Sequence, residues 1–444
     1  MVIRVHRIAA ATAVAASVAS GAAAQGAPLP EASPEEVGMS SERLSALTET
    51  MQAYVDDGDL AGAIVMIARD GKIPYFETFG LRDLEADASM EEDTIFRIAS
   101  QTKAIVSAAV MKLQEDGELL ITDPVGKYLP EFMETTVAVP SEAHGYVVVP
   151  ADRPITIRDL LTHTSGYSYG EGVAADRWEE AGLQGWYFGH FDEPIREVVR
   201  RMAALPADAQ PGEEWIYGYN TDILGALVEE VSGQPLDAYL QETFFEPLGM
   251  EDTHFYLPEE KRDRLATVYS RSDAGEITRA PDESRMDAQG AYVDGPRVAL
   301  SGGAGLLSTA NDYMRFLEMM RNEGEDLDGD RILSPKTVEL MTVDHLGEIE
   351  FRPGVGFGLG FEVVEDLGER GRLGSESEYR WGGAYHTTYW IDPVEDMSVA
   401  FFTQLRPTGG LDTQEKLRAL VYQAIVASPC CGDGEDAETA AATD

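Results

Sequence analysis

The chain contains very little cysteine. Its only two cysteines, Cys430 and Cys431, are adjacent and close to the C-terminal end. A disulfide between them, a link to another chain and two free thiols are all open, but none of these could join distant parts of one fold. The stability of the fold must therefore come from a hydrophobic core, and a content of 44% apolar residues allows a sizeable one.

Positive charge is also scarce. The 444 residues include 34 Lys and Arg against 79 Asp and Glu, which gives a formal net charge of −45. A surface this acidic repels phosphate groups and the headgroups of anionic lipids. We therefore expect no nucleic-acid partner and no binding to anionic membranes.

Long apolar stretches are missing outside the first 24 residues. Those residues contain Arg4 and Arg7, continue as an alanine-rich run and end in Ala22-Ala23-Ala24, a pattern typical of a secretory signal peptide. A disordered or helical tail is the alternative. No other run is long enough to cross a bilayer. The sequence thus predicts a signal peptide at residues 1–24, no stable membrane insertion and a periplasmic or secreted protein.

Several catalytic and ligand-binding signatures are absent. The seven histidines show no H-E-x-x-H or other metal-ligand spacing, and no glycine-rich phosphate loop is present. We interpret His163 as a structural turn residue and not as a catalytic base. A G-x-S-x-G elbow is also missing, so the α/β-hydrolase route to an esterase is unsupported. We expect neither a metal ion nor an organic cofactor.

The segment Ser100-Gln101-Thr102-Lys103 carries the first chemical signal. Residues 104–117 predict a buried helix that ends at a glycine. Positions i and i+3 share one helix face, which brings the hydroxyl of Ser100 within reach of the amine of Lys103. A serine hydroxyl needs an adjacent base, and a lysine provides one where burial or a nearby cation lowers its pKa. The helix N-terminus adds a positive dipole end beside a developing oxyanion.

The remaining pattern predicts an α+β fold. Residues 41–55 and 413–426 read as helices, and residues 62–68, 73–79, 387–391 and 397–403 read as strands. Residues 25–120 and 296–428 therefore predict one α/β lobe, in which helices flank an antiparallel sheet. Residues 121–295 predict an inserted, mainly helical lobe, and residues 429–444 a disordered acidic tail.

Six separated segments together resemble the serine hydrolases of the penicillin-recognising superfamily, specifically its class C β-lactamase-like, penicillin-binding-protein-like esterase branch. In chain order they are residues 93–103, 123–130, 160–166, 210–217 with 222–225, 302–309 and 381–385. The resemblance spans nearly all of the chain after residue 24. It implies a β-lactamase/transpeptidase-like fold.

The resemblance also implies a role for each catalytic residue. Ser100 attacks the acyl carbon, Lys103 acts as the base or assists it, and Tyr217 passes a proton to the leaving group. A phenol can do this only where positive charge or hydrogen bonding lowers its pKa from about 10. The backbone N–H groups of Ser100 and Ala384 form the implied oxyanion hole.

Two positions depart from the β-lactamase pattern. Trp381 stands where lactam-cleaving members have a lysine, and Tyr219 stands where many have an asparagine, with Asn220 one place late. Those two groups hold the carboxylate and the side-chain amide of a lactam, so their absence favours a neutral ester. The predicted substrate contacts are Trp381, Gly382, Gly383, Tyr219 and His386.

The sequence therefore predicts a serine carboxylesterase that cleaves short-chain acyl esters through an acyl-enzyme, with a small-molecule ester as its partner. A β-lactamase or a D-amino-acid peptidase is the alternative within the same class. A catalytically dead module that binds cell-wall or acyl groups is the alternative outside enzymes. The joint presence of serine, lysine and tyrosine argues against the dead module.

Overall fold

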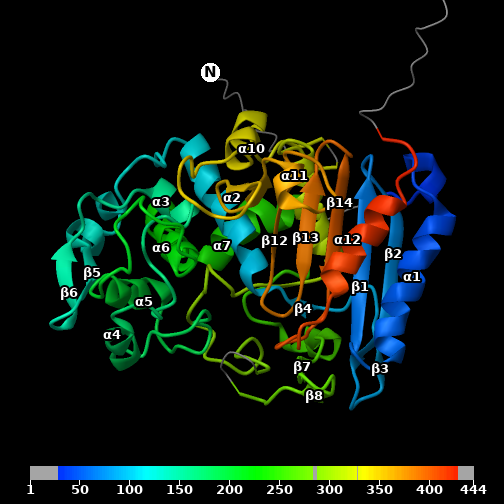
Figure 1. The fold of residues 1–444 in the computed structure, drawn as a ribbon, viewed down its shortest axis with the longest axis horizontal. Coiled ribbons are helices and arrows are strands. Elements are labelled where there is room, and N and C mark those ends of the chain that lie inside the picture. Colours follow the sequence, from blue (N-terminus) through cyan, green and yellow to red (C-terminus); the bar gives the residue numbers. More distant parts are fainter. Residues whose placement is uncertain (1–28, 284–287, 328, 429–444) are drawn as a thin grey trace, which may run out of the picture.

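The structure is a computed structural model that describes residues 29–283, 288–327 and 329–428. The predicted signal peptide, the two cysteines and the predicted acidic tail all lie outside these described residues. Figure 1 shows a sheet with helices on both faces on one side of the molecule and a helix-rich part on the other. This arrangement confirms the predicted fold class.

An eight-stranded antiparallel sheet is built from both ends of the chain, in the order β10-β11-β12-β13-β14-β1-β2-β3 (Figure 1). Strand β1 (Gly62–Arg69) pairs with β2 (Lys72–Asp83) on one side and with β14 (Met397–Phe402) on the other. The other strands are β3 (Ala88–Ser89), β10 (Val355–Phe357), β11 (Glu362–Val364), β12 (Tyr379–Gly382) and β13 (Thr388–Asp392).

Both faces of the sheet are covered. Every residue of β1 is buried, as expected of a strand with helices on each side. Val65 and Ile67 pack in one core cluster with residues of α1 (Ser41–Asp56) and α12 (Thr413–Gln423). The alternate residues of β1 face the second cluster, which includes α2 (Thr102–Glu115) and α9 (Ala310–Arg321). This two-sided burial explains the continuous apolar run in the sequence.

The helix-rich part follows α2 along the chain and ends before β9 (Leu307–Ser308), a short strand that pairs with β4 (Phe96–Arg97). Its helices are α3 (Ile157–Leu161), α4 (Ala175–Glu180), α5 (Ile195–Met202), α6 (Asn220–Ser232), α7 (Leu236–Leu240) and α8 (Glu246–Leu248). Helices α10 (Pro335–Met341) and α11 (Leu367–Arg370) follow later. Short 3-10 or π turns span Pro34–Val37, Ala99–Gln101, Val125–Lys127, Pro130–Glu134, Gln241–Phe245 and Glu259–Arg264.

Two small hairpins interrupt the helix-rich part and were not predicted. One pairs β5 (Thr136–Ser141) with β6 (Gly145–Pro150), and the other pairs β7 (Tyr269–Arg271) with β8 (Ile277–Arg279). Every residue of β6 is at least partly exposed. β6 therefore lacks the alternation of buried apolar and exposed polar residues by which a strand is predicted from sequence.

Helix α2 joins the two parts of the molecule. It packs against α6 of the helix-rich part, while the turn at its start contacts β12 of the sheet. The N-terminal end of α2 thus lies where the helix-rich part meets the sheet. Among the described residues, no helix combines the length and the hydrophobicity that a membrane crossing requires.

Candidate active site

Ser100 lies in the short 3-10 turn Ala99–Gln101 that leads directly into α2. The preceding residue, Ala99, has a φ of 43°, in the left-handed region that non-glycine residues rarely adopt. The surrounding structure holds this conformation, in part because Ile98 N–H donates to the carbonyl of Leu306 at 3.1 Å. Strained residues of this kind are common next to functional groups. Ser100 itself keeps 9% of its surface exposed and opens into a pocket.

The amine of Lys103 is buried behind Ser100, with 2% of the residue exposed. Its Nζ lies 3.4 Å from Ser100 Oγ and 3.2 Å from the hydroxyl of Tyr169, and it donates to the carbonyl of Gly303 at 2.7 Å. The same nitrogen lies 4.7 Å from the centroid of the Tyr217 ring. These contacts place one amine next to both the hydroxyl and the phenol that the sequence singled out.

A buried carboxylate supports the loop that holds Lys103. Asp222 Oδ1 accepts hydrogen bonds from Gly303 N–H at 3.1 Å and from the Ser301 hydroxyl at 2.7 Å. Burial raises the pKa of Asp222, while the charge of Lys103 and these hydrogen bonds act in the opposite direction. A side chain at position 303 would come within 2.3 Å of Asp222, so only glycine allows this approach.

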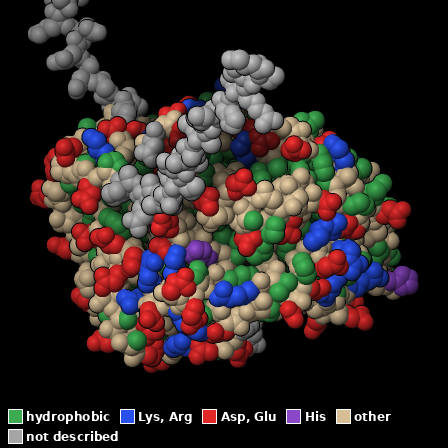
Figure 2. All heavy atoms as spheres, turned by 180° about the vertical axis from the view of Figure 1, so that it is seen from behind, with side chains coloured by type: hydrophobic (Ala, Val, Ile, Leu, Met, Phe, Trp, Pro, Cys, Tyr) green, Lys and Arg blue, Asp and Glu red, His purple; other side chains and the backbone are tan. Residues whose placement is uncertain are grey.

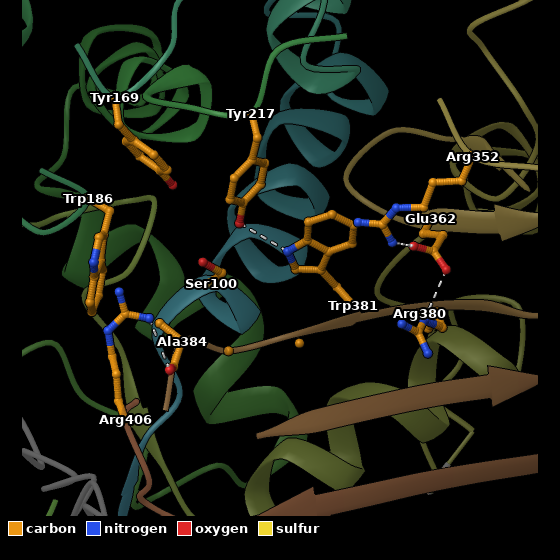
Figure 3. Close-up of a pocket in the computed structure, with 12 residues that line it drawn as sticks. Ser100, Tyr169, Trp186, Tyr217, Arg352, Glu362, Arg380, Trp381, Ala384 and Arg406 are labelled. Atoms are coloured by element: carbon orange, nitrogen blue, oxygen red, sulfur yellow. Dashed lines mark hydrogen bonds and ion pairs between the residues drawn. The ribbon is translucent and has the colours of Figure 1, made fainter. Parts of the chain in front are cut away.

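Tyr217 lies across the pocket from Ser100 (Figure 3). The indole N–H of Trp381 donates to the phenolic oxygen of Tyr217 at 3.0 Å. An indole can only donate, so the phenolic oxygen must accept this hydrogen bond. The amine of Lys103 lies over the same ring, so this phenol meets a hydrogen-bond donor at its oxygen and a basic nitrogen at its ring face.

His163 supports Tyr217 from behind. The two ring centroids lie 4.8 Å apart, and Nδ1 of His163 lies 2.8 Å from the amide nitrogen of Asn220. Burial, with a smaller effect of the Lys103 charge, lowers the pKa of His163 well below its usual value. The ring is thus a neutral packing element at the turn, in agreement with its interpretation as a structural residue.

The turn that follows β12 lies beside Ser100. A side chain at Gly383 would come within 2.4 Å of the Ile98 carbonyl oxygen, so glycine lets the end of the strand approach the segment before Ser100. Gly383 N–H donates to the Thr387 carbonyl at 2.8 Å. Among the hydrogen bonds that the described residues form in this turn, none uses the N–H of Ala384. Ala384 lines the same pocket as Ser100, as a donor to an oxyanion must.

The pocket has a volume of about 390 Å³, within the usual range for small-molecule sites. It is lined by Ser100, Tyr169, Trp186, Tyr217, Arg352, Glu362, Arg380, Trp381, Gly382, Gly383, Ala384 and Arg406 (Figure 3). The structure therefore brings together most of the predicted site residues. Among the residues that the structure describes, no grouping of His, Cys, Asp or Glu could hold a metal ion.

Two predicted substrate contacts lie elsewhere, and we correct both. Tyr219 is fully buried, and its hydroxyl faces the carbonyls of Leu183 and, at 3.1 Å, Tyr169. The side chain of His386 turns toward α12, with Nε2 3.2 Å from the hydroxyl oxygen of Thr413. Neither residue lines the pocket, because hydrogen bonds to other parts of the chain hold each side chain elsewhere.

Sequence reasoning missed half of the pocket lining. Tyr169 follows the matched segment 160–166 by three positions, a proximity that could have marked it. Burial raises the pKa of Tyr169 well above its usual value, so its phenol stays protonated beside Lys103. Trp186 and Arg406 come from loops without any motif, and no signal in the sequence could have placed them there.

Comparisons with known proteins find similarity over most of the chain. A family model described as Beta-lactamase matches residues 47–423. The esterase EstB of Burkholderia gladioli is 35% identical over 368 residues, which cover 78% of this chain and 86% of EstB. The lovastatin esterase of Penicillium rubens is 30% identical over 414 residues, which cover 84% of this chain and 97% of that enzyme.

A solved structure gives the same result. EstCE1, described as a hydrolase with promiscuous acyltransferase activity, superimposes with a TM-score of 0.73 at 28% sequence identity. The superposition covers 86% of this chain and 98% of EstCE1. The resemblance inferred from the six segments is thereby confirmed.

Proposed function

The chain belongs to the Beta-lactamase family and is a serine hydrolase that cleaves esters, and we propose that it acts on short-chain acyl esters through Ser100, Lys103 and Tyr217. The observation that carries this proposal is the position of the Lys103 amine. It lies 3.4 Å from the Ser100 hydroxyl oxygen and directly over the Tyr217 ring, in a pocket of about 390 Å³.

The proposed reaction has two halves. Lys103, assisted by Tyr217, takes the proton of Ser100 as Oγ bonds to the ester carbonyl carbon, and the N–H groups of Ser100 and Ala384 stabilise the oxyanion. The bond from carbon to the alcohol oxygen then breaks, and Tyr217 delivers the proton to the departing alcohol. Water next attacks the acyl carbon and gives a proton to the pair of Lys103 and Tyr217. The bond from that carbon to Ser100 Oγ then breaks, Oγ takes the proton back, and the acid leaves.

Hydrolysis of p-nitrophenyl butyrate tests this proposal. We expect Ser100→Ala to lower kcat by at least about 10³-fold and Tyr217→Phe by about 10²- to 10⁴-fold. Ser45→Ala is the matched control, because it removes an exposed hydroxyl on α1. A serine-directed fluorophosphonate should label Ser100. Full activity of Ser100→Ala, or no adduct on Ser100, would contradict the mechanism.

The same assay separates the family alternatives. Trp381 places an indole where a lactam-cleaving site needs a cation, so we expect the ester to be cleaved much faster than a chromogenic cephalosporin. Rapid turnover of the cephalosporin without ester cleavage would favour a β-lactamase. Absence of both activities in a folded protein would favour the non-catalytic binding module.

We also propose that the enzyme is exported. The support is the basic, apolar and small-residue pattern of residues 1–24. Expression of the full chain in a bacterium should yield a mature protein in the periplasm or medium whose N-terminus lies close to Gln25. An intact N-terminus in the cytoplasmic fraction would contradict this proposal.

A further inference from the structure

A second, smaller pocket lies between strand β12 and helix α12, both labelled in Figure 1. Its volume is about 200 Å³. Three arginines line it, Arg372, Arg380 and Arg418, and among the described residues of its lining Glu415 alone carries a carboxylate. Along the whole chain, acidic residues outnumber basic ones 79 to 34, and acidic side chains are spread over the face shown in Figure 2. The composition of this pocket is therefore the reverse of that of the molecule.

Arg380 is only partly paired. Its Nε lies 3.1 Å from a carboxylate oxygen of Glu362, which also forms an ion pair with Arg352 (Figure 3). One carboxylate thus faces two guanidinium groups. The terminal nitrogens of Arg380, Nη1 and Nη2, donate no hydrogen bond to any group that the structure describes. Glu362 lines the pocket of Ser100 and not the second pocket, so the carboxylate that pairs with Arg380 belongs to the Ser100 side.

Arg418 is held in a fixed position by a second buried carboxylate. Its terminal nitrogens donate to the two oxygens of Glu378 at 2.6 and 2.9 Å, and Glu378 also pairs with Arg370 at 2.8 Å. The hydroxyl of Tyr422 lies 2.8 Å from an oxygen of Glu378 and 2.8 Å from an oxygen of Asp392. Even with Asp392 counted as charged, the four arginines of these two groups outnumber the three carboxylates. The wall behind the pocket is therefore positive.

An exposed pair completes the lining. Arg372 Nη2 lies 3.6 Å from a carboxylate oxygen of Glu415, and both side chains are about half exposed. This separation is too long for a hydrogen bond, and exposed pairs of this kind contribute little to stability. The guanidinium of Arg372 can therefore exchange Glu415 for another anion at low cost.

We propose that this second pocket binds a small divalent oxyanion of the sulfate or phosphate class. Guanidinium groups present paired N–H donors that match the oxygens of such an anion, and they stay charged at every working pH. The volume of about 200 Å³ lies below the usual range for organic ligands, which favours a compact ion. The anion is not the substrate, so the proposal is independent of the proposed esterase function and agrees with a neutral ester at Ser100.

Isothermal titration calorimetry of the full chain with sodium sulfate tests the proposal. The buffer contains about 0.15 M NaCl, because a screening length of about 8 Å limits the repulsion between the acidic surface and the anion. We expect one site per chain with a Kd below about 1 mM. Sodium phosphate added beforehand should raise the apparent Kd for sulfate, because both ions would occupy the same site.

Substitutions in the lining locate the site. Arg372→Gln and Arg380→Gln should each raise Kd by at least about 5-fold, the effect of one charge-assisted hydrogen bond. Glu415→Gln should instead lower Kd by at least about 3-fold, because it removes the carboxylate that competes for Arg372. Arg200→Gln is the matched control, because Arg200 is also an exposed arginine paired with a glutamate, on α5, and its loss should leave Kd unchanged.

Three results would overturn the inference. They are the absence of saturable sulfate binding, a Kd in Arg372→Gln equal to that in Arg200→Gln, and weaker binding in Glu415→Gln. Arg372 and Glu415 are both exposed, so their variants keep the test decisive if Arg380→Gln does not fold. A failure of the esterase proposal looks different, because it leaves p-nitrophenyl butyrate uncleaved and Ser100 unlabelled by a fluorophosphonate whether or not sulfate binds.

Discussion

At the scale of single residues, the chemistry of the pocket depends on how one buried amine is held. Lys103 donates to the carbonyl of Gly303, and Gly303 is in turn fixed by its N–H bond to Asp222. Asp222 does not line the pocket and is fully buried. Asp222 is therefore a positioning residue. It acts through the two hydrogen bonds that it accepts from the loop holding Lys103, and not through contact with substrate.

Truncation of Asp222 should therefore lower kcat more than it changes KM. In Asp222→Ala, Gly303 and Ser301 lose their shared acceptor and the loop can shift, so we expect kcat to fall by about 10- to 100-fold. Asp222→Asn keeps an acceptor oxygen and should restore most of kcat. The measurement is steady-state hydrolysis of p-nitrophenyl butyrate beside a thermal melt. A folded Asp222→Ala enzyme with unchanged kcat would show that the loop needs no such support.

The indole N–H of Trp381 is the second residue with a testable role. Trp381→Phe keeps an aromatic wall but removes the donor to the Tyr217 hydroxyl, and we expect kcat to fall by about 5- to 30-fold, the value of one hydrogen bond. Trp215→Phe removes an indole that stacks on the same ring at 5.8 Å, so it is the matched comparison. Equal losses in the two variants would assign the effect to packing and not to the hydrogen bond.

At the scale of elements, prediction from sequence worked where burial follows a regular pattern. The helix predicted at residues 41–55 is observed as Ser41–Asp56, and the strand predicted at 62–68 as Gly62–Arg69. Both have apolar residues at the spacing that their buried faces require. In the hairpin of β5 and β6 only the neighbouring residues Val137 and Ala138 are buried, and every residue of β6 is at least partly exposed, so no regular alternation marks it and it was missed for that reason.

The site was predictable only where a side chain follows from a motif. Ser100 and Lys103 share a helix face by spacing alone. The direction of Tyr219 was not predictable, because it precedes α6 and packs inward against Trp178, with ring centroids 5.4 Å apart. The position of Arg406 depends on how the chain leaves β14, and this is a property of tertiary packing that local sequence does not encode.

The turn between β12 and β13 makes the fold sensitive to acid. Burial lowers the pKa of His386 in this turn to about 4, with Glu415 acting in the opposite direction. Between about pH 6.5 and 4 the unfolded chain therefore binds a proton that the folded chain does not. The contribution is complete above about pH 6.5 and is lost as the pH falls toward 4, at a cost of roughly 3 kcal/mol.

His386→Asn should reduce this acid sensitivity. Asparagine tolerates the φ of 69° at this position but does not titrate. Urea unfolding at about pH 7 and about pH 5 should show a smaller loss of unfolding free energy in the variant than in the parent. His144→Asn, at an exposed site between β5 and β6, is the matched control for the replacement of a histidine by asparagine. An equal loss of unfolding free energy between these two pH values in the parent and in His386→Asn would contradict the assignment of the acid sensitivity to His386.

At the scale of the whole molecule, the site forms only when the two parts of the fold meet. Tyr217 and Tyr169 come from the helix-rich part, whereas Trp381 and Ala384 come from the edge of β12 and its turn. Ser100 lies at this junction, in the turn that contacts β12 and leads into α2, the helix that packs against α6. Because β1 pairs with β14, residues near both ends of the chain must associate before this junction exists.

The net charge of −45 opposes the association of the two parts of the fold at this junction. Like charges repel across the molecule, and raising the salt from about 10 mM to about 1 M shortens the screening length from about 30 Å to about 3 Å. We expect the melting temperature to rise by at least about 3 °C over this range in NaCl. A neutral solute such as sucrose, matched in osmolality, controls for solute exclusion from the surface.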